Sequence, residues 1–592
     1  MSLTIRLLGT PAIARDGSPV PPPRGGKAWG LLAHLLLSGR PVGRRELAAL
    51  LFPEADDPLG ALRWSLAELR RALGLPDALR GDPPVLELPP GTVVDALSPS
   101  PDDAGGDLLE GLSFDTSPGF DAWLSVERRR QASAGEAVLH EAALAALAAG
   151  RTDDAVRLAT RVVALNPLEE GHHELLVRSL AMAGDRAGAL AQADRCEAVL
   201  VTELGVPPSP AVRRAAYAAD PPPGPPPSGG RAAARGQLEA GEAAAAAGAV
   251  ETAVDRLRRA CSEAAASGDG RLRAEALVAL GTTLIHACRG RDEEGSAVLH
   301  QAIAVAERAG DRASGVAARR ELGYVYVQAG VRERAERWLR AAEAMAEGDA
   351  ELASVHAFQG MDLSDRAEYG PALQRLEESV RLAEAAGNGR LAAWSGSLIG
   401  RLHLLRGDDA PAATALGRTL EVVDSERWVA FRPWPETLLA ELELRAGDVD
   451  GAADRLEHAW SVACQVEDPC WEGFSARAIG LLEEGRGRPG EARRWLAEAA
   501  TRCTRVPDRY QWAHGHVLDA RAAVAVRTGD PEAMATAHDL LDLAARCGMR
   551  ELVVRAQLHL AALGVEGMRE SAALLARDID NPVLEPLLAT PV

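Results

Sequence analysis

Residues 400–412, GRLHLLRGDDAPA, set a glycine and an alanine twelve positions apart in a stretch rich in leucine and alanine. Across the C-terminal part of the chain, a small residue returns every 37 to 42 positions. Alanine follows five of these residues by twelve positions, whereas the first unit has Glu293 there and the last has Ala533 one position later. The small residues are Gly281, Gly323, Gly360, Gly400, Ala440, Gly480 and Ala520, and the alanines are Ala335, Ala372, Ala412, Ala452 and Ala492.

Close helix packing explains such a spacing. Two antiparallel helices approach closely only where facing side chains are small, so we expect the small residue of one helix to meet the alanine of the next. Stacked pairs then form a solenoid with a continuous core, and the pattern resembles tetratricopeptide repeats with a period near 40 instead of 34. It predicts about eight helix pairs between residues 235 and 565. The turn pairs that open successive units are Gly268-Asp269, Gly310-Asp311, Gly387-Asn388 and Pro507-Asp508.

The middle of the chain has the shorter period. Ala155 and Ala189 are 34 positions apart, and so are Gly150 and Gly184, which predicts two standard repeats over residues 136–200. A run of proline and glycine, residues 220–230, then predicts an extended linker.

The N-terminal region mixes short strands with helices. Residues 5–9 and 12–14 predict a short hairpin, and residues 85–88 and 92–94 predict a closing hairpin. Between them, helices are expected at residues 27–37, 44–51 and 58–73, the last two stopped by proline and glycine. Three helices followed by a hairpin indicate a winged helix-turn-helix. The fold class expected for the whole chain is mainly α, with this winged helix and its small hairpins preceding a helical tetratricopeptide-like domain and an α-solenoid.

The third predicted helix carries the candidate DNA contacts. Leucines at i, i+4, i+7 and i+11, namely Leu62, Leu66, Leu69 and Leu73, should face the core. Arginines and a tryptophan on the other side could enter a major groove, and the start of the preceding helix could hold a phosphate on its amides. A solvated basic face on a small helical domain would give the same spacing. The candidate DNA-binding residues are Arg44, Arg45, Arg63, Trp64, Ala67, Arg70 and Arg71.

Several motifs resemble a known regulator family. The segments at residues 6–9, 25–27, 45–47, 61–63 and 69–74 look like the DNA-binding domain of the Streptomyces antibiotic regulatory proteins, which is similar to the OmpR-type winged helix. Residues 120–128, 166–170, 187–190 and 203–210 resemble the bacterial transcriptional activator domain that follows it in that family. The resemblance covers residues 3–216. It implies binding to promoter repeats in double-stranded DNA, engagement of RNA polymerase and homodimer contacts.

The chain departs from that family in two ways. Its wing, residues 86–92, carries Glu87 and no arginine or tyrosine, which predicts fewer phosphate contacts. Larger family members often place a nucleotide-binding ATPase after the activator domain, whereas here repeats follow directly. Lys27 is the single lysine among 65 basic residues, and it lacks the glycine and Ser or Thr of a phosphate-binding loop, which argues against ATPase and kinase chemistry.

Other chemistry finds little support in the residues. The seven scattered cysteines lack a CxxC pair and predict buried, reduced thiols. His172-His173 and His514/His516 are not at metal-ligand spacings, so we expect packing or surface roles, no metal, no cofactor and no enzyme activity. Neither a signal peptide nor a membrane span is recognisable, so the expected location is cytoplasmic, without membrane contact.

Eight tryptophans lie in the repeats, and two interpretations remain open for them. They could fill space between helices or form a binding surface, for which residues 428–435, WVAFRPWP, are the best candidate.

The domain boundaries expected from these patterns are 1–95 for the winged helix, 96–219 for the activator domain, 220–230 for the linker and 231–592 for the solenoid. Charge follows these divisions. Residues 1–75 carry a net +4, although the whole chain carries -20. We therefore predict a sequence-specific DNA-binding transcriptional regulator whose repeats bind a protein or small-molecule effector. The family resemblance implies that it acts as an activator. The alternative is an interaction scaffold whose winged helix no longer binds DNA.

Overall fold

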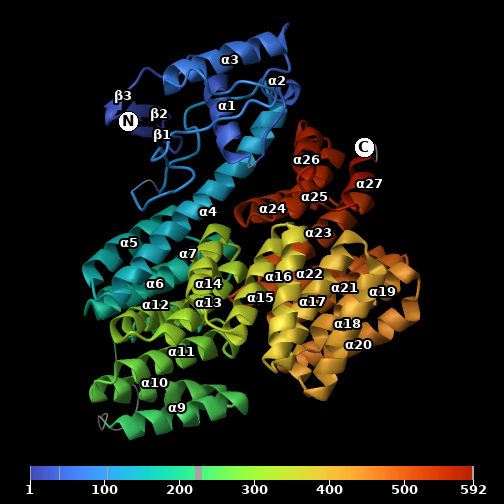
Figure 1. Cartoon of the computed structure of the whole chain (residues 1–592). Helices are drawn as coiled ribbons and strands as arrows, with labels where there is room; N and C mark the ends of the chain where they lie inside the picture. Colours follow the sequence, from blue (N-terminus) through green and yellow to red (C-terminus); the bar gives the residue numbers. More distant parts are fainter. Residues whose placement is uncertain (1, 39, 103, 220–229, 590–592) are drawn as a thin grey trace.

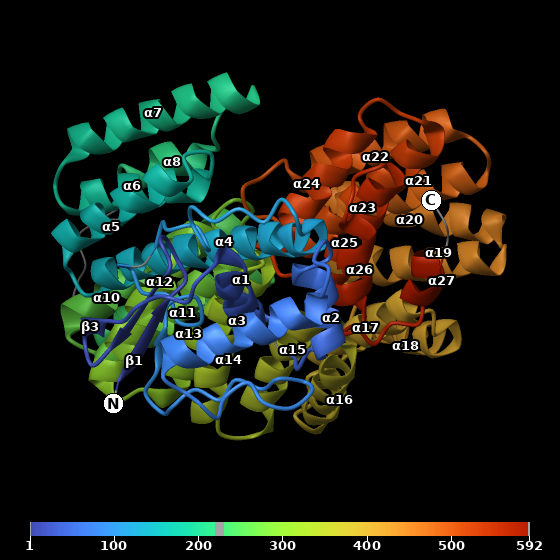
Figure 2. The same cartoon turned by 90° about the horizontal axis from the view of Figure 1, so that it is seen from above.

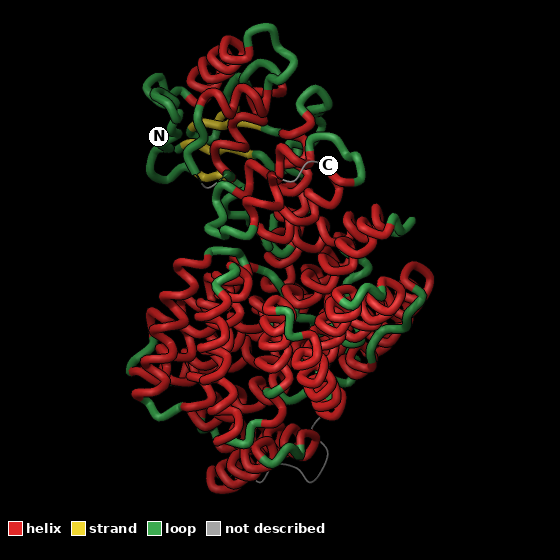
Figure 3. The backbone as a smooth tube through the Cα atoms, turned by 90° about the vertical axis from the view of Figure 1, so that its right-hand side faces the viewer, coloured by secondary structure: helices red, strands yellow, loops and turns green. Residues whose placement is uncertain are grey.

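The computed structural model describes residues 2–38, 40–102, 104–219 and 230–589. Helices dominate this part of the chain, and its one four-stranded sheet lies near the N-terminus (Figures 1 and 3). The predicted mainly α class is confirmed. The predicted linker lies outside the described residues, apart from Gly230.

The small sheet has the strand order β3-β2-β1-β4. Strands β1 (Leu3–Arg6) and β2 (Ala12–Arg15) pair antiparallel with Ile5 opposite Ile13, which confirms the first hairpin, and β3 (Ser18–Pro19) extends it. The predicted closing hairpin is wrong. Residues 85–88 form no strand, and β4 (Val93–Val94) pairs with β1 in parallel. Residues 85–88 lie between two pairs of prolines, and the Val85 carbonyl accepts the Leu79 N–H at 2.9 Å instead of pairing with residues 92–94.

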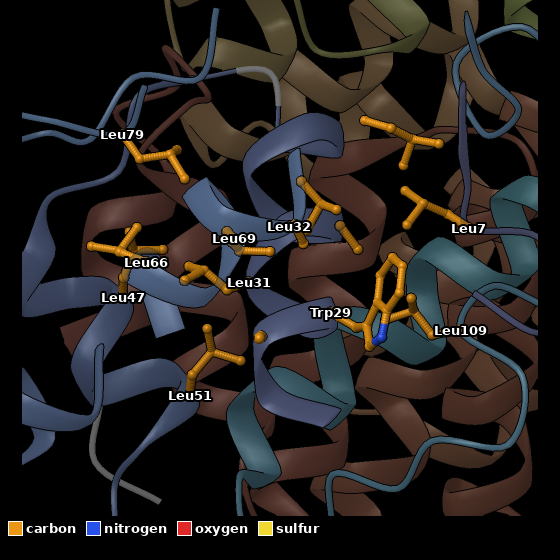
Figure 4. Close-up of a cluster of buried hydrophobic side chains, with 14 of the residues drawn as sticks. Leu7, Trp29, Leu31, Leu32, Leu47, Leu51, Leu66, Leu69, Leu79 and Leu109 are labelled. Atoms are coloured by element: carbon orange, nitrogen blue, oxygen red, sulfur yellow. The ribbon is translucent and has the colours of Figure 1, made fainter. Parts of the chain in front are cut away.

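Three helices cover this sheet, at the positions that the sequence predicts. They are α1 (Gly26–Leu37), α2 (Arg44–Leu51) and α3 (Pro58–Leu73). Helix α3 begins where the Asp57 carboxylate accepts the Gly60 N–H at 2.8 Å, and it ends at Gly74 with φ 65°. Its leucine face is buried against α1 and α2, as Figure 4 shows for Leu31, Leu66 and Leu69. The predicted core face is therefore confirmed.

The same hydrophobic core continues past residue 95. The Asp95 carboxylate accepts the backbone N–H groups of Leu7 and Leu8 at 2.8 and 3.1 Å, which fixes the chain beside β1. Farther on, Phe114, Phe120 and Leu124 are buried among the side chains of α1 and the sheet. The N-terminal unit therefore takes part of its core from the segment that follows it.

Helix α4 (Pro118–Ala148) connects this unit to the rest of the molecule (Figure 1). Its first turns belong to the N-terminal core, whereas Leu139, Ala143 and Leu144 pack in a second cluster with α5 (Thr152–Leu165). The next helices are α6 (Glu170–Met182), α7 (Arg186–Leu204) and α8 (Pro210–Ala215). Helix pairs α4/α5 and α6/α7 confirm two repeats over residues 136–200, although α4 begins well before the first of them.

Eight antiparallel helix pairs follow in the described residues, as the periodicity predicts. A further pair and a short terminal helix close the chain. The helices are α9 (Arg231–Ala246), α10 (Val250–Ser267), α11 (Gly270–His286), α12 (Asp292–Ala309), α13 (Arg312–Gln328), α14 (Arg332–Met345), α15 (Asp349–Asp365), α16 (Tyr369–Ala385), α17 (Gly389–Arg406), α18 (Asp409–Ser425), α19 (Pro433–Ala446), α20 (Val449–Val466), α21 (Pro469–Gly485), α22 (Pro489–Cys503), α23 (Gln511–Thr528), α24 (Ala533–Arg546), α25 (Arg550–Ala562), α26 (Met568–Ala576) and α27 (Leu584–Ala589).

The repeated glycine lies against a leucine of the partner helix. A Cβ atom on Gly400 would lie 2.5 Å from Leu416 Cγ, and one on Gly360 would lie 2.5 Å from Leu376 Cγ and 3.3 Å from the Ala372 carbonyl oxygen. The expected glycine–alanine contact therefore involves the alanine backbone, whereas the closest side chain is the leucine four residues later. In the first unit, Gly295 takes the alanine's place beside Gly281.

Three of the four predicted opening turns cap helices. The side chains of Asp269, Asp311 and Asn388 accept N–H groups at the starts of α11, α13 and α17. Pro507-Asp508 lies in the turn before α23, which begins at Gln511, but it does not cap that helix. The Asp508 carboxylate instead accepts the backbone N–H groups of Arg291 and Asp292 at 2.7 and 3.2 Å, joining two distant repeats.

The repeat tryptophans that the structure buries serve packing. Trp434 and Trp512 are 3% exposed and share one cluster with Phe474. In the irregular segment, a short 3₁₀ turn (Val429–Phe431) brings Phe431 under Trp428 with ring centroids 4.3 Å apart. The packing interpretation is confirmed for Trp434 and Trp512.

The glycine–leucine contact leads to a prediction with an internal control. Gly400→Ala should lower the free energy of unfolding by about 1–3 kcal/mol, because the new methyl group would overlap Leu416. Gly417→Ala in the next helix should raise it by about 0.5–1 kcal/mol, because a methyl group there meets no atom within 4 Å and alanine favours the helix. Urea unfolding followed by circular dichroism measures both. Equal effects of the two substitutions would contradict this account.

A second prediction concerns acid stability. Burial lowers the pKa of His34 in α1 to about 4, and neighbouring Arg40 adds to the shift. This value lies below the pKa of about 6.5 in the unfolded chain. The contribution of neutral His34 to the free energy of unfolding is therefore complete above pH 6.5 and is lost as the pH falls toward 4. His34→Phe should therefore reduce the loss of unfolding free energy between pH 7.5 and pH 5 by about 2 kcal/mol. An unchanged pH dependence in this variant would show that His34 is not titrating there.

Candidate nucleic-acid interface

Helix α3 presents its polar face at one end of the molecule, far from α9 and α10 (Figure 1). Trp64 is 51% exposed, and Arg63, Ala67 and Arg71 are also exposed. In the view from above, α3 lies beside α2 at the same end (Figure 2). The structure thus gathers five of the predicted residues on one helix, opposite its buried leucines.

Trp64 rests against a glycine of the preceding loop. A Cβ atom on Gly25 would lie 3.6 Å from the Trp64 ring, and Gly25 has a φ of 80°, so a larger residue would be strained as well as crowded. One edge of the ring is held in this way while about half of the side chain stays open. A planar aromatic held so can contact a base edge or a deoxyribose.

Arg71 is held by protein groups on the flank of this face. Its Nη2 donates to Glu68 Oε2 at 2.8 Å and to the Pro22 carbonyl at 2.9 Å, and Glu68 also accepts the Arg24 backbone N–H at 3.1 Å. The hydrogen bonds from Arg71 and Arg24 lower the pKa of Glu68. This network fixes the loop before α1 to α3.

Arg44 is bound to the loop that follows α3. Its Nε and Nη2 donate to the carbonyls of Gly81 and Leu79 at 2.5 and 3.2 Å, and its backbone N–H donates to Asp82 Oδ1 at 2.7 Å. The expectation that the N-terminal amides of α2 suit a phosphate therefore stays a prediction, but it no longer includes the first amide. A carboxylate that the sequence places 38 positions away already occupies it.

The remaining predicted arginines differ in how exposed their side chains are and in how firmly other groups of the protein bind them. Arg45 is exposed and has no hydrogen bond or ion pair with the described residues. Arg63 makes one exposed ion pair, 3.2 Å from Asp57, and such pairs contribute little to stability. Arg70 is half-buried and its Nε donates to the Leu66 carbonyl at 3.2 Å.

The predicted set misses Arg24. This residue is exposed and directly precedes the glycine that supports Trp64. In the sequence, Arg24 belongs to the basic run around Gly25 and Gly26. An interpretation based on the face of α3 alone leaves this preceding loop out. Lys27 in the same run lies over the Phe52 ring at 5.3 Å, and burial lowers its pKa.

Acidic groups limit the positive charge of this end. Asp57 caps α3, Asp82 caps α2, and Glu87 in the loop before β4 is exposed. Within that loop, residues 85–92 form no strand and carry no basic side chain. Phosphate contacts would therefore come from a few arginines on α2, α3 and the loop before α1.

The other sites considered in the sequence have packing roles. His173 is buried and bonds the Pro167 carbonyl and Gln192 at 2.9 Å, while burial lowers the pKa of His172 to about 3 and that of His514 to about 4. All seven cysteines are free thiols. Within the described ranges, no group of three or more His, Cys, Asp or Glu side chains is placed to hold a metal ion. Nor does any described helix have the length and apolar character needed to cross a bilayer.

Solved structures similar to this chain have low overall scores. A Rap protein complexed with competence and sporulation factor has 12% identity and a TM-score of 0.39, with 58% of this chain and 88% of that chain covered. Mycobacterium tuberculosis EmbR in complex with a low-affinity phosphopeptide has 21% identity and a TM-score of 0.29, with 36% and 64% covered. Yeast Tom70 has 12% identity and a TM-score of 0.31, with 79% and 96% covered. At these scores, neither their partners nor their activities transfer to this chain.

Comparisons of sequence give one specific match. No curated protein matches the chain. The family model of the bacterial transcriptional activator domain matches residues 103–218, the part that contains α4 to α8. This match confirms the resemblance to the Streptomyces antibiotic regulatory proteins at the domain that follows the winged helix. Residues 103–218 of this chain are therefore similar to the bacterial transcriptional activator domain.

Proposed function

We propose that this protein is a sequence-specific DNA-binding transcriptional regulator that acts as an activator. The observation that carries the proposal is the activator domain placed directly behind a three-helix unit whose third helix buries its leucines and exposes arginine and tryptophan. We further propose that it is cytoplasmic and has no enzyme activity. Its partners would be promoter repeats in double-stranded DNA, RNA polymerase, a second copy of the chain and an effector on the repeats.

Helix α3 would enter the major groove with Arg63, Trp64 and Ala67 facing the base edges. Arg45 and Arg24 are exposed, and in the described residues neither side chain makes a hydrogen bond or a close ion pair, although the charge of Arg24 interacts with Glu68; this suits phosphate contacts. Arg44, Arg70 and Arg71 are held by protein oxygens, so we propose that they mainly fix the geometry of α2 and α3. Each retains N–H groups that could also reach a phosphate.

Binding of this kind should depend moderately on salt. Each neutralised phosphate contributes about -0.9 to the slope of log K against log salt, and few arginines are free here. Specificity would then rest on base contacts by α3 more than on general attraction, since the whole chain carries -20.

The test starts by selecting genomic fragments with the full chain and measuring affinity across salt. Arg63→Ala should cost about 1–3 kcal/mol on the selected site and relax its sequence preference, because it removes a base contact. Arg45→Ala should weaken binding to all sequences alike and reduce the salt slope by about 1, because it removes a phosphate contact.

Arg494→Ala provides the matched control. This exposed arginine lies on α22, paired with Glu491 at 2.7 Å, and its loss should leave DNA binding unchanged. If the folded wild-type chain enriches no DNA sequence, the proposed function is wrong.

A scaffold function is the second candidate, favoured by specific observations. Carboxylates cap both α2 and α3, and the segment expected to form the wing is a loop with an exposed Glu87. These features all weaken attraction for phosphates. A folded chain that binds DNA without sequence preference, or not at all, yet holds a protein partner through its repeats, would support the scaffold.

A further inference from the structure

A cavity of about 290 Å³ lies where the N-terminal unit meets the repeats. One wall is formed by α1 and α4, another by α14, and the third by α24, α25 and α26. The volume is roughly twice that of the ~150 Å³ cavity that admits benzene in a model protein, so a bicyclic organic molecule would fit. Sites for small ligands occur preferentially at such junctions.

The walls combine apolar surface with a few polar groups. Leu37 of α1, Trp123 and Val126 of α4, and Val553 of α25 provide the apolar part. His34 and Gln557 line the same cavity, and the two ring nitrogens of His34 and the Gln557 Oε1 are buried without a hydrogen-bond partner in the described residues. Buried polar groups without a hydrogen-bond partner destabilise the folded chain, and a bound molecule that supplies the partner removes this cost.

The carboxylates that line the cavity are engaged by arginines. The lining carboxylates are already matched, as shown by Glu127 and Glu333 with Arg130 at 2.9 and 2.8 Å, and by Asp578 with Arg40 at 2.8 Å. Glu336 and Glu368 are likewise paired with arginines.

Arg550 differs from the other lining arginines. It has no ion pair among the described residues, and its Nε donates only to the Arg366 carbonyl at 3.0 Å. The remaining guanidinium N–H groups of this half-buried side chain are therefore available to an acceptor.

A second guanidinium with an unused N–H lines the cavity close by. Arg332 Nε donates to the Cys547 carbonyl at 2.8 Å and Nη1 to Asp362 at 3.0 Å, whereas Nη2 is buried and unpaired in the described structure. Its Cγ lies 3.2 Å from where a Cβ on Gly548 would be, two residues before Arg550. Two arginines with unused N–H groups thus line the cavity beside the turn between α24 and α25.

We infer that this cavity binds a small organic monocarboxylate with an apolar body. The carboxylate would accept from Arg550 and Arg332, and the body would pack on Trp123 and Leu37. Because α1 packs on α3 and forms part of the wall, an occupant would join the repeats to the DNA-binding end and change DNA affinity. The regulatory half rests on the proposed function, whereas the binding half does not.

The binding test uses the full chain with 2-naphthoate and octanoate as probes and 2-naphthamide as the uncharged control. Isothermal titration should give saturable binding of at least one carboxylate and at least tenfold weaker binding of the amide. Arg550→Gln should weaken the carboxylate at least tenfold. Arg521→Gln should not, since this half-buried arginine of α23 also lacks an ion pair in the described residues but lies outside the cavity.

A second variant tests the location without touching a charge. Ala134→Phe on α4 should fill the cavity and abolish binding of the carboxylate, with the circular dichroism spectrum and Tm confirming a folded chain. No saturable binding of either carboxylate to the wild type, or equal binding to Arg550→Gln, would overturn the site.

DNA binding is then titrated with and without the bound probe. A shift of threefold or more in Kd for the selected fragment supports coupling, and an unchanged Kd overturns it. If the chain selects no DNA, the proposed function fails while the carboxylate titration still decides the cavity.

Discussion

Helix α4 is the element on which the arrangement of the whole molecule depends. Its first turns bury Phe120 and Leu124 in the N-terminal core, and its last turns complete the first repeat. Between them, Arg129 pairs with Asp542 of α24 at 2.8 Å, and His140 pairs with Glu293 of α12 at 2.9 Å. A 31-residue helix spans this distance as one element, so it fixes the N-terminal unit relative to α12 and α24 of the solenoid.

The repeats return to α4 because their packing is regular. A glycine that meets a leucine brings six of the eight described helix pairs together closely, and Ala440 and Ala520 take its place in the other two, so successive pairs stack in a similar way. This curvature brings α24 and α26 back beside the start of the chain, where Arg577 pairs with Glu46 and Arg40 with Asp578, both at 2.8 Å. The cavity with Arg550 exists only because of that return.

The candidate DNA-binding surface shows which structural features a local sequence pattern can predict. Leucine spacing and the Asp57 and Gly74 signals predict both ends and the buried face of α3, because these depend on residues within a few turns. The predicted closing hairpin is wrong, because Val93 and Val94 pair with β1 instead of with residues 85–88. This pairing joins residues 88 or more positions apart, which a local pattern does not include. The roles of Arg44 and Arg71 likewise depend on carbonyls of distant loops, which no helix-wheel argument includes.

Sequence alone determined the helix pairs, their period, the leucine face of α3 and the activator domain, since each follows from spacing along one or two neighbouring helices or from a recognisable motif. Tertiary structure decided which arginines stay free, that Asp82 occupies the α2 terminus, and that Arg332 and Arg550 meet at one cavity. The physical reason is that hydrophobic periodicity acts over a few turns of helix. Charge pairing and cavities form between segments that only the completed fold brings together.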